Sequence, residues 1–186
     1  MRFWSRAVET PLLFACNQCG DCCREMRIPL SHEDLLAIRQ RHPELPLQEW
    51  LQFYPVESTH PDALWLEQKP GILLLRQRQG ACTFLQDNRC GVYAYRPRVC
   101  RIWPFEHVPG ERALRIAPQH SMLVKLACDQ TPMPRSEHHE IHREIDAIAK
   151  VSRLYDLWIQ QWNQSRRHAE SGNTLVDFVH FLQAKV

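Results

Sequence analysis

The sequence has few glycines and no long apolar run, and both absences exclude classes of protein. Glycine occurs only six times in 186 residues, and no glycine-rich loop that could cradle a nucleotide phosphate is present. No stretch approaches the roughly 20 apolar residues that span a bilayer. The amino terminus carries Glu9 and Pro11 and lacks the apolar segment of a secretory signal. We therefore expect no nucleotide fold, no membrane span and a cytoplasmic location.

An excess of charge of either sign is also missing. Lys and Arg number 23 and Asp and Glu 21, which gives a formal net charge of +2. This balance argues against broad, charge-driven binding of nucleic acid. The chain is long enough to bury a hydrophobic core of its own, so a metal need not be its only source of stability.

Cysteine, by contrast, is abundant. The first four cysteines form a C-x2-C-x2-C-C knot, and the other four follow a 58-residue insert at separations of seven, nine and 27 residues. A cytosolic compartment keeps thiols reduced, which favours metal ligation over structural disulfides. The candidate metal and cofactor ligands are Cys16, Cys19, Cys22, Cys23, Cys82, Cys90, Cys100 and Cys128.

The spacing of the knot indicates which metal it holds. Three cysteines at two-residue spacing place three thiolates around one small object, as in the ligation of [4Fe-4S] clusters by bacterial-type ferredoxins. Zinc sites with four cysteines usually draw C-x2-C pairs from two separate segments, and the second half of this chain has no such pair. An iron-sulfur cluster is therefore favoured, with zinc as the alternative. Two four-thiolate sites, one site with spare thiols, and one site with a disulfide all remain open.

The adjacent Cys22 and Cys23 raise a separate question, because successive side chains usually diverge and are not expected to bind the same metal. Cys23 would then serve a second metal, act as a redox-active thiol, or pack in the core. The neighbouring Arg24 either offsets the negative charge of the thiolates or is a solvated surface arginine.

Local patterns predict a mixture of helices and strands before the carboxyl-terminal third. A helix is expected over residues 31–41, where a serine caps the first turn. A second short helix is expected over 47–54, closed by the following proline. Two apolar runs, 63–66 and 72–75, flank a Pro-Gly turn and predict a hairpin. Another strand is predicted at 112–116.

The carboxyl-terminal third predicts two helices. Apolar residues recur at intervals of three and four from Ile141 to Trp162, which indicates one long amphipathic helix starting near Ser136. A final helix is expected from Thr174 to Ala184. The fold class is therefore α+β: a small, irregular, cysteine-rich core centred on a metal, with short strands or a hairpin, a long helix and a final short helix. We expect a metal-binding domain over residues 1–130 and a helical extension packed on it over 131–186.

Several segments together resemble the YkgJ-type CxxCxxCC cysteine-cluster family. They are Phe14 to Arg24, which contains the knot, Cys82-Thr83-Phe84-Leu85, Cys90-Gly91-Val92-Tyr93, and Arg96 to Phe105. The resemblance implies a zinc- or iron-chelating domain, and a similar domain in flagellin lysine N-methylase is associated with an iron-sulfur cluster. Seven cysteines from Cys16 to Cys100 fit the family pattern. Cys128 falls where a later cysteine is common, although the Pro-Gly that often follows is Asp129-Gln130 here.

Two further groups of residues are candidates for a role at the centre. Trp103 and Phe105 flank Cys100 and could shield a cluster from water, or form a hydrophobic corner that needs no metal. His138 and His142 are four residues apart and could place two imidazoles on one helical face, but they lack the glutamate of the metalloprotease motif.

Three functions compete at this point. The first is an iron-sulfur protein that transfers electrons or senses oxidants for a protein partner. The second is a metal-dependent modifying enzyme, for which the sequence names no catalytic residue and no glycine-rich motif for S-adenosylmethionine. The third is a structural zinc protein whose carboxyl-terminal helices bind another protein.

Overall fold

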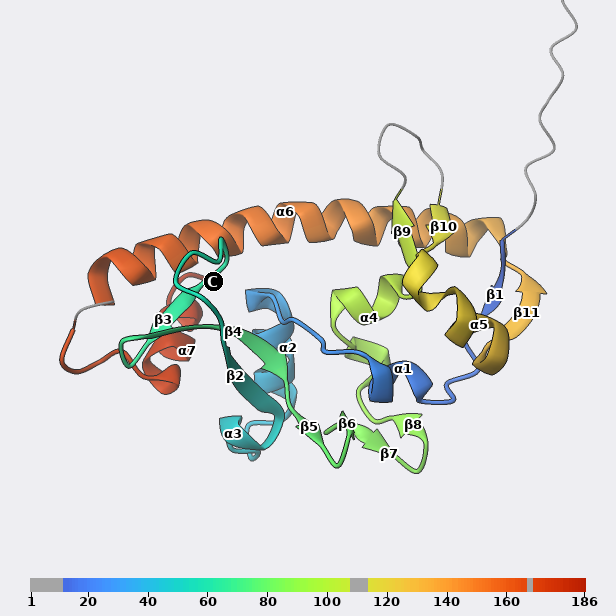
Figure 1. Ribbon diagram of the computed structural model, residues 1–186. Coiled ribbons are helices and arrows are strands. Elements are labelled where there is room, and N and C mark those ends of the chain that lie inside the picture. The colour runs from blue at the N-terminus through green and yellow to red at the C-terminus, as the bar shows by residue number, and fades with distance from the viewer. Residues whose placement is uncertain (1–11, 108–113, 167–168) are drawn as a thin grey trace, which may run out of the picture.

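The molecule is organised along one long helix, α6 (Arg135–Arg166), which runs over its whole length (Figure 1). This computed structural model describes residues 12–107, 114–166 and 169–186. A three-stranded sheet, α2 and α7 lie beside the carboxyl-terminal half of α6, and the cysteine-bearing elements lie beside its amino-terminal half (Figure 1). The predicted α+β class is confirmed. Within the described ranges, none of the helices is both long and apolar enough to cross a membrane.

The sheet is antiparallel and has the order β2-β4-β3. Its strands are β2 (Leu51–Pro55), β4 (Lys69–Leu75) and β3 (Leu64–Leu66). Strands β3 and β4 form a hairpin from the two predicted apolar runs, but its turn is at Glu67 and Gln68, which both have positive φ. Such a turn matches the right-handed twist of the flanking strands. The predicted turn at Pro70-Gly71 is wrong, because these residues pair with β3 as part of β4.

The predicted helix over residues 47–54 is wrong in its second half. Only α3 (Leu47–Trp50) is helical, and the chain continues from Leu51 as strand β2, which pairs with β4. The apolar residues of this segment satisfy a helical spacing, but its backbone groups find partners on a neighbouring strand. Tertiary pairing therefore overrides the local pattern.

The two carboxyl-terminal helices pack on the same core as the sheet. The indole nitrogen of Trp162 donates to the carbonyl of Trp65 at 2.9 Å, and the Asn163 side chain bonds the backbone of both Ala63 and Trp65. Helix α7 (Leu175–Gln183) begins with a capping box between Thr174 and Asp177. Both helices were predicted and are confirmed. The division of the chain at residue 130 stays a prediction.

The cysteine-bearing half consists of short elements around α1. They are β1 (Leu13–Ala15), α1 (Asp21–Glu25), β5 (Gln77–Arg78), β6 (Ala81–Cys82), β7 (Leu85–Gln86), β8 (Arg89–Cys90), η1 (Tyr93–Tyr95), α4 (Arg98–Ile102), β9 (Phe105–His107), β10 (Leu114–Ile116), η2 (Pro118–His120), α5 (Ser121–Ala127) and β11 (Asp129–Pro132). Strand β10 confirms the strand predicted at 112–116 over its last three residues. Residues 112 and 113 of the predicted strand lie outside the described ranges. The pairs β1-β11, β5-β6, β7-β8 and β9-β10 are antiparallel.

Helix α2 (His32–Arg41) connects the two halves through one buried carboxylate. Asp34 closes the capping box with Ser31, accepting its backbone N–H at 3.1 Å and its hydroxyl at 2.7 Å. Its other oxygen accepts the backbone N–H of Arg98, the first residue of α4, at 3.0 Å. Asp34 therefore fixes the start of the helix that carries Cys100.

We expect Asp34→Ala to lower the free energy of unfolding by about 1–3 kcal/mol more than Asp177→Ala does. Asp177 is a matched control because it closes the same kind of capping box on α7, and the hydrogen bonds recorded for its side chain all go to Thr174. Urea unfolding of the three proteins measures the difference. Equal losses would show that the bond from Asp34 to α4 contributes nothing.

Candidate metal centre

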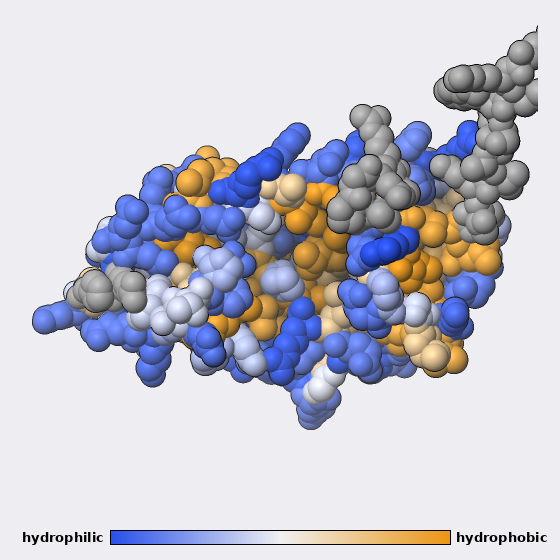
Figure 2. Space-filling model, turned by 45° about the horizontal axis from the view of Figure 1, so that its top comes forward, coloured by the Kyte–Doolittle hydropathy of each residue, from blue (hydrophilic) through white to orange (hydrophobic). Residues whose placement is uncertain are grey.

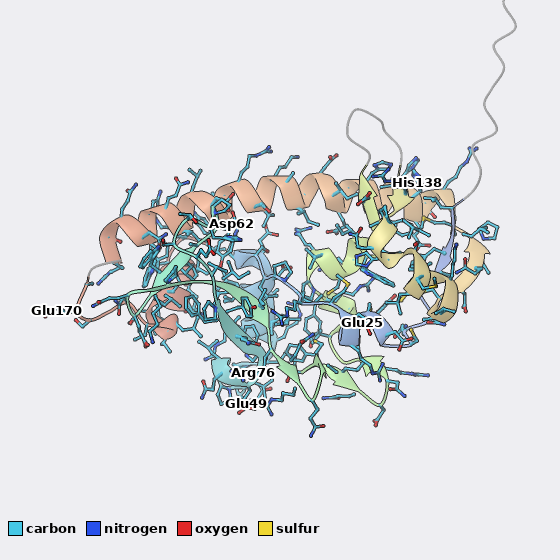
Figure 3. All side chains as sticks on the ribbon, in the orientation of Figure 1. Glu25, Glu49, Asp62, Arg76, His138 and Glu170 are labelled. Atoms are coloured by element: carbon cyan, nitrogen blue, oxygen red, sulfur yellow. The ribbon has the colours of Figure 1, made fainter. Side chains whose placement is uncertain are left out.

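All eight cysteines lie in the described part of the chain, and all are free thiols. They come from distant segments: the β1-α1 segment supplies four, the hairpins β5-β6 and β7-β8 supply Cys82 and Cys90, α4 supplies Cys100, and the end of α5 supplies Cys128. Cys82 is buried, Cys16 is exposed, and the other six are half-buried. Figure 3 shows sulfur atoms gathered between α1 and α4.

Helix α1 directs its two cysteines to different places. Consecutive residues of a helix project about 100° apart. Cys23 packs against the main hydrophobic core, as do Cys90 and Cys100, and Cys82 is part of that core. Cys22 packs instead against a second hydrophobic cluster, together with Cys128. The helix contacts both β6 and α5, and it lies between the small hairpins and α5 in Figure 1.

The thiols nearest the main core are close enough to change one another's protonation. The neighbouring Cys23 thiol lowers the pKa of Cys90 to about 6, with a further contribution from the charge of Arg96. Contact with Cys22, followed by contact with Cys90, raises the pKa of Cys23. Burial raises the pKa of Cys82 to about 11.

Cys100 and the thiols near α5 show a similar mutual influence. Burial, followed by the negative charge of Cys82, raises the pKa of Cys100 well above its usual value. Burial raises the pKa of Cys128 to about 12, and the charges of Cys19 and Cys16 add to this. Cys128 therefore lies beside the amino-terminal knot, although it follows in sequence by more than 100 residues.

These thiols fit a metal centre in chemistry and need some rearrangement in geometry. In the described ranges, no three His, Cys, Asp or Glu side chains already form a site for one metal ion. Several thiolates brought together in a partly buried place repel one another, and a bound cation reverses this effect. Metal binding would therefore release the thiol protons and turn the side chains toward the ion.

Gly20 sets the path of the chain between Cys19 and α1. It precedes the helix with a φ of +81°, a conformation that glycine adopts at little cost. A Cβ at this position would lie 2.6 Å from Cδ1 of Leu85 and 3.1 Å from the carbonyl oxygen of Asn88, both in the β7-β8 hairpin. A side chain here would therefore combine a strained backbone with displacement of the hairpin that carries Cys90.

Asn17 is a positioning residue that the sequence analysis missed. Its side-chain oxygen accepts the backbone N–H of Cys19 at 3.2 Å, and its side-chain nitrogen donates to the carbonyl of Ala127 at 2.9 Å. The first bond is the local turn that asparagine often makes with the residue two positions on, so it could have been expected. The second bond joins the knot to the end of α5, and no local pattern predicts it.

The basic residue beside the thiols is Arg96 rather than Arg24. Arg24 bonds Asp21 at 3.2 Å and also Asn88, so it connects α1 to the turn between β7 and β8. Arg96 donates to the carbonyls of Tyr93 at 3.0 Å and Cys100 at 3.4 Å, and its guanidinium stacks 3.9 Å from the Tyr93 ring centroid. Its charge acts on Cys90.

The aromatic pair predicted to shield the centre packs at a different cysteine. Trp103 and Phe105 are buried together with Phe14, whose ring centroid lies 6.1 Å from that of Trp103 and 5.1 Å from that of Phe105. This cluster packs against Cys22 and Cys128, whereas Cys100 packs against the main core. The rings therefore cover the knot near α5 and not the cysteine that they adjoin in sequence.

The histidine pair on α6 is also brought together. The rings of His138 and His142 lie 4.8 Å apart between centroids. No third ligand completes a metal site with them among the residues that the structure describes.

Comparison with known proteins gives one match. A family model named CxxCxxCC and described as a "putative zinc- or iron-chelating domain" matches residues 15–129, which is more than half of the chain. The matched segment contains all eight cysteines. No curated protein and no solved structure matches the chain.

We expect Gly20→Ala to lower the free energy of unfolding by about 1–3 kcal/mol and to reduce the metal bound per chain, because it combines backbone strain with a clash against the β7-β8 hairpin. Gly80→Ala is the control: its φ is +78°, and a Cβ there meets nothing within 4 Å. Denaturant unfolding and metal analysis compare the two variants. Equal effects would mean that the close approach at Gly20 is unimportant.

Proposed function

Because the chain belongs to the CxxCxxCC family of zinc- or iron-chelating domains, we propose that its cysteines bind an iron-sulfur cluster of the [4Fe-4S] type. The cluster transfers electrons or senses oxidants for a protein partner. The proposed ligands are drawn from the eight free thiols, which come from five separate parts of the chain.

One observation carries this proposal: a distant cysteine lies beside the C-x2-C-x2-C run. The run consists of Cys16, Cys19 and Cys22. After burial, the charges of these three cysteines add to the raised pKa of Cys128. Asn17 bonds the end of the helix that precedes Cys128 and so fixes this approach. Three closely spaced thiolates and a fourth from elsewhere form the ligand set of a four-iron cluster.

The surroundings support a cluster with a tuned potential. A bound iron-sulfur cluster supplies a redox couple whose potential depends on burial and on hydrogen bonds to its sulfurs. Trp103 and Phe105 pack where they exclude water from one side of Cys22 and Cys128. Cys16 is exposed, so the centre stays accessible at this ligand to an electron carrier or an oxidant.

The protein partner is proposed from the surface beside this exposed ligand. Figure 2 shows hydrophobic residues at the end of the molecule that carries β1, β11 and α5. Met122 and Leu126 of α5 are 67% and 79% exposed, and Leu13 of β1 is 43% exposed. They lie on the elements that lead to Cys128 and Cys16. Exposed apolar side chains of this kind mark contact sites for other proteins.

A metal-dependent enzyme is the second candidate, and one cavity favours it. A polar cavity of about 570 Å³ lies between η1, α4 and α6. It is lined by charges of both signs, among them Arg101, Glu140 and Glu144, and by Tyr93, whose pKa is raised by burial and, to a smaller extent, by Cys16. A polar substrate held there would lie close to the knot. An iron atom without a cysteine ligand would favour this function.

Anaerobically purified protein should contain iron and acid-labile sulfide in equal amounts and show a reversible redox couple. Elemental analysis, sulfide determination and voltammetry measure these quantities. His138→Ala/His142→Ala is the control, and it should keep the same iron content, because the histidine pair has no part in the site. Stoichiometric zinc without sulfide would replace the proposal with the structural alternative, and protein that folds without any metal would refute both.

A further inference from the structure

We propose that the eight thiols form two separate four-thiolate centres, and that the adjacent cysteines of α1 belong one to each. The outer centre consists of Cys16, Cys19, Cys22 and Cys128 and takes the iron-sulfur cluster. The inner centre consists of Cys23, Cys82, Cys90 and Cys100 and takes a single zinc ion. This inference rests on the proposed function and specifies how its ligands are divided.

The first argument is the direction of the two side chains on α1. Consecutive helical positions are rotated by about 100°, so the side chains of Cys22 and Cys23 leave α1 in different directions. Cys23 faces the main hydrophobic core, and Cys22 faces the cluster that contains Phe14 and Trp103. One short helix therefore distributes its thiols between two cores.

The second argument is that each core already holds the remaining ligands of one centre. The main core contains Cys82, and Cys90 and Cys100 pack against it together with Cys23. The second cluster has Cys128 packed against it together with Cys22. The last two thiols, Cys16 and Cys19, lie on either side of Asn17, whose side chain accepts the backbone N–H of Cys19 and donates to the carbonyl of Ala127, the residue before Cys128. The division is four and four.

The scaffold of the inner group supports a closed, structural site. Cys82 is only 7% exposed. Cys82 and Cys90 each end a strand of a two-residue hairpin, opposite Gln77 and Leu85 respectively. Cys100 lies on α4, whose first residue is bonded to Asp34. Structural zinc sites use four protein ligands and leave no open position. The exposed Cys16 distinguishes the outer centre, which remains open to redox partners.

The two centres adjoin at α1. Cys22 and Cys23 are consecutive residues of this helix, and α1 contacts both β6, which carries Cys82, and α5, which leads to Cys128. A single shared centre is therefore the competing arrangement, and removing one ligand at a time separates the two possibilities.

The test compares Cys128→Ala with Cys90→Ala, each on the full chain prepared without oxygen. Wild-type protein should contain about four iron atoms, four sulfides and one zinc ion. Cys128→Ala should lose the iron and sulfide and keep the zinc. Cys90→Ala should lose the zinc and keep the iron and sulfide. Circular dichroism confirms that each variant retains the helical content of the wild type, and Cys16→Ala and Cys82→Ala repeat the comparison if either variant fails to fold.

The outcomes separate the two levels of the claim. If both variants lose the same metal, or if the wild type contains iron and sulfide without a second metal, the division into two centres is wrong and the proposed function stands. If the wild type contains no iron and sulfide at all, the proposed function itself fails.

Discussion

The structure depends on the repulsion between closely placed sulfurs and on what relieves it. Eight thiols from five parts of the chain lie around one short helix. Burial raises the pKa of Cys82, Cys100 and Cys128, whereas contact with Cys23 lowers the pKa of Cys22 and Cys90. A cation of high charge stabilises the deprotonated sulfurs and, through them, the contacts between distant segments. If the cysteines bind metal as proposed, metal binding and the folding of the cysteine-bearing half are coupled.

The rest of the fold acts as a frame for these sulfurs. Asp34 ties the start of α4 to the start of α2, and Asn17 ties the knot to the end of α5. Gly20 permits the knot to lie against the hairpin that carries Cys90. On the other side, Trp162 and Asn163 anchor the long helix to the sheet. The core around Trp50, Trp162 and Phe178 also contains Cys82, and Cys23, Cys90 and Cys100 pack against it, so the inner thiols connect this core to the metal centre.

Local rules predicted the elements that are stabilised locally. The capping boxes of α2 and α7, the long apolar repeat of α6 and the two apolar runs of the β3-β4 hairpin were all legible in the sequence. The turn of this hairpin was placed at Pro70-Gly71, whereas the chain turns at Glu67 and Gln68. Strand β2 was misread because the spacing of its apolar residues also suits a helix, and only its pairing with β4 decides between the two. The candidate cysteines and their family were likewise legible. The divergence of Cys22 and Cys23 followed from backbone geometry, but which thiols each would meet depends on tertiary packing. The same holds for Arg96, for Tyr93 and for the aromatic rings that cover Cys128.

X-ray absorption at the iron and zinc edges of anaerobic, untreated protein tests the central claim most directly, because it counts the atoms bound to each metal. The account predicts four sulfur neighbours at about 2.3 Å around each metal, together with iron–iron scattering from the cluster. Nitrogen or oxygen as the main neighbours, or a sulfur spectrum showing cysteines bridged to one another, would contradict it.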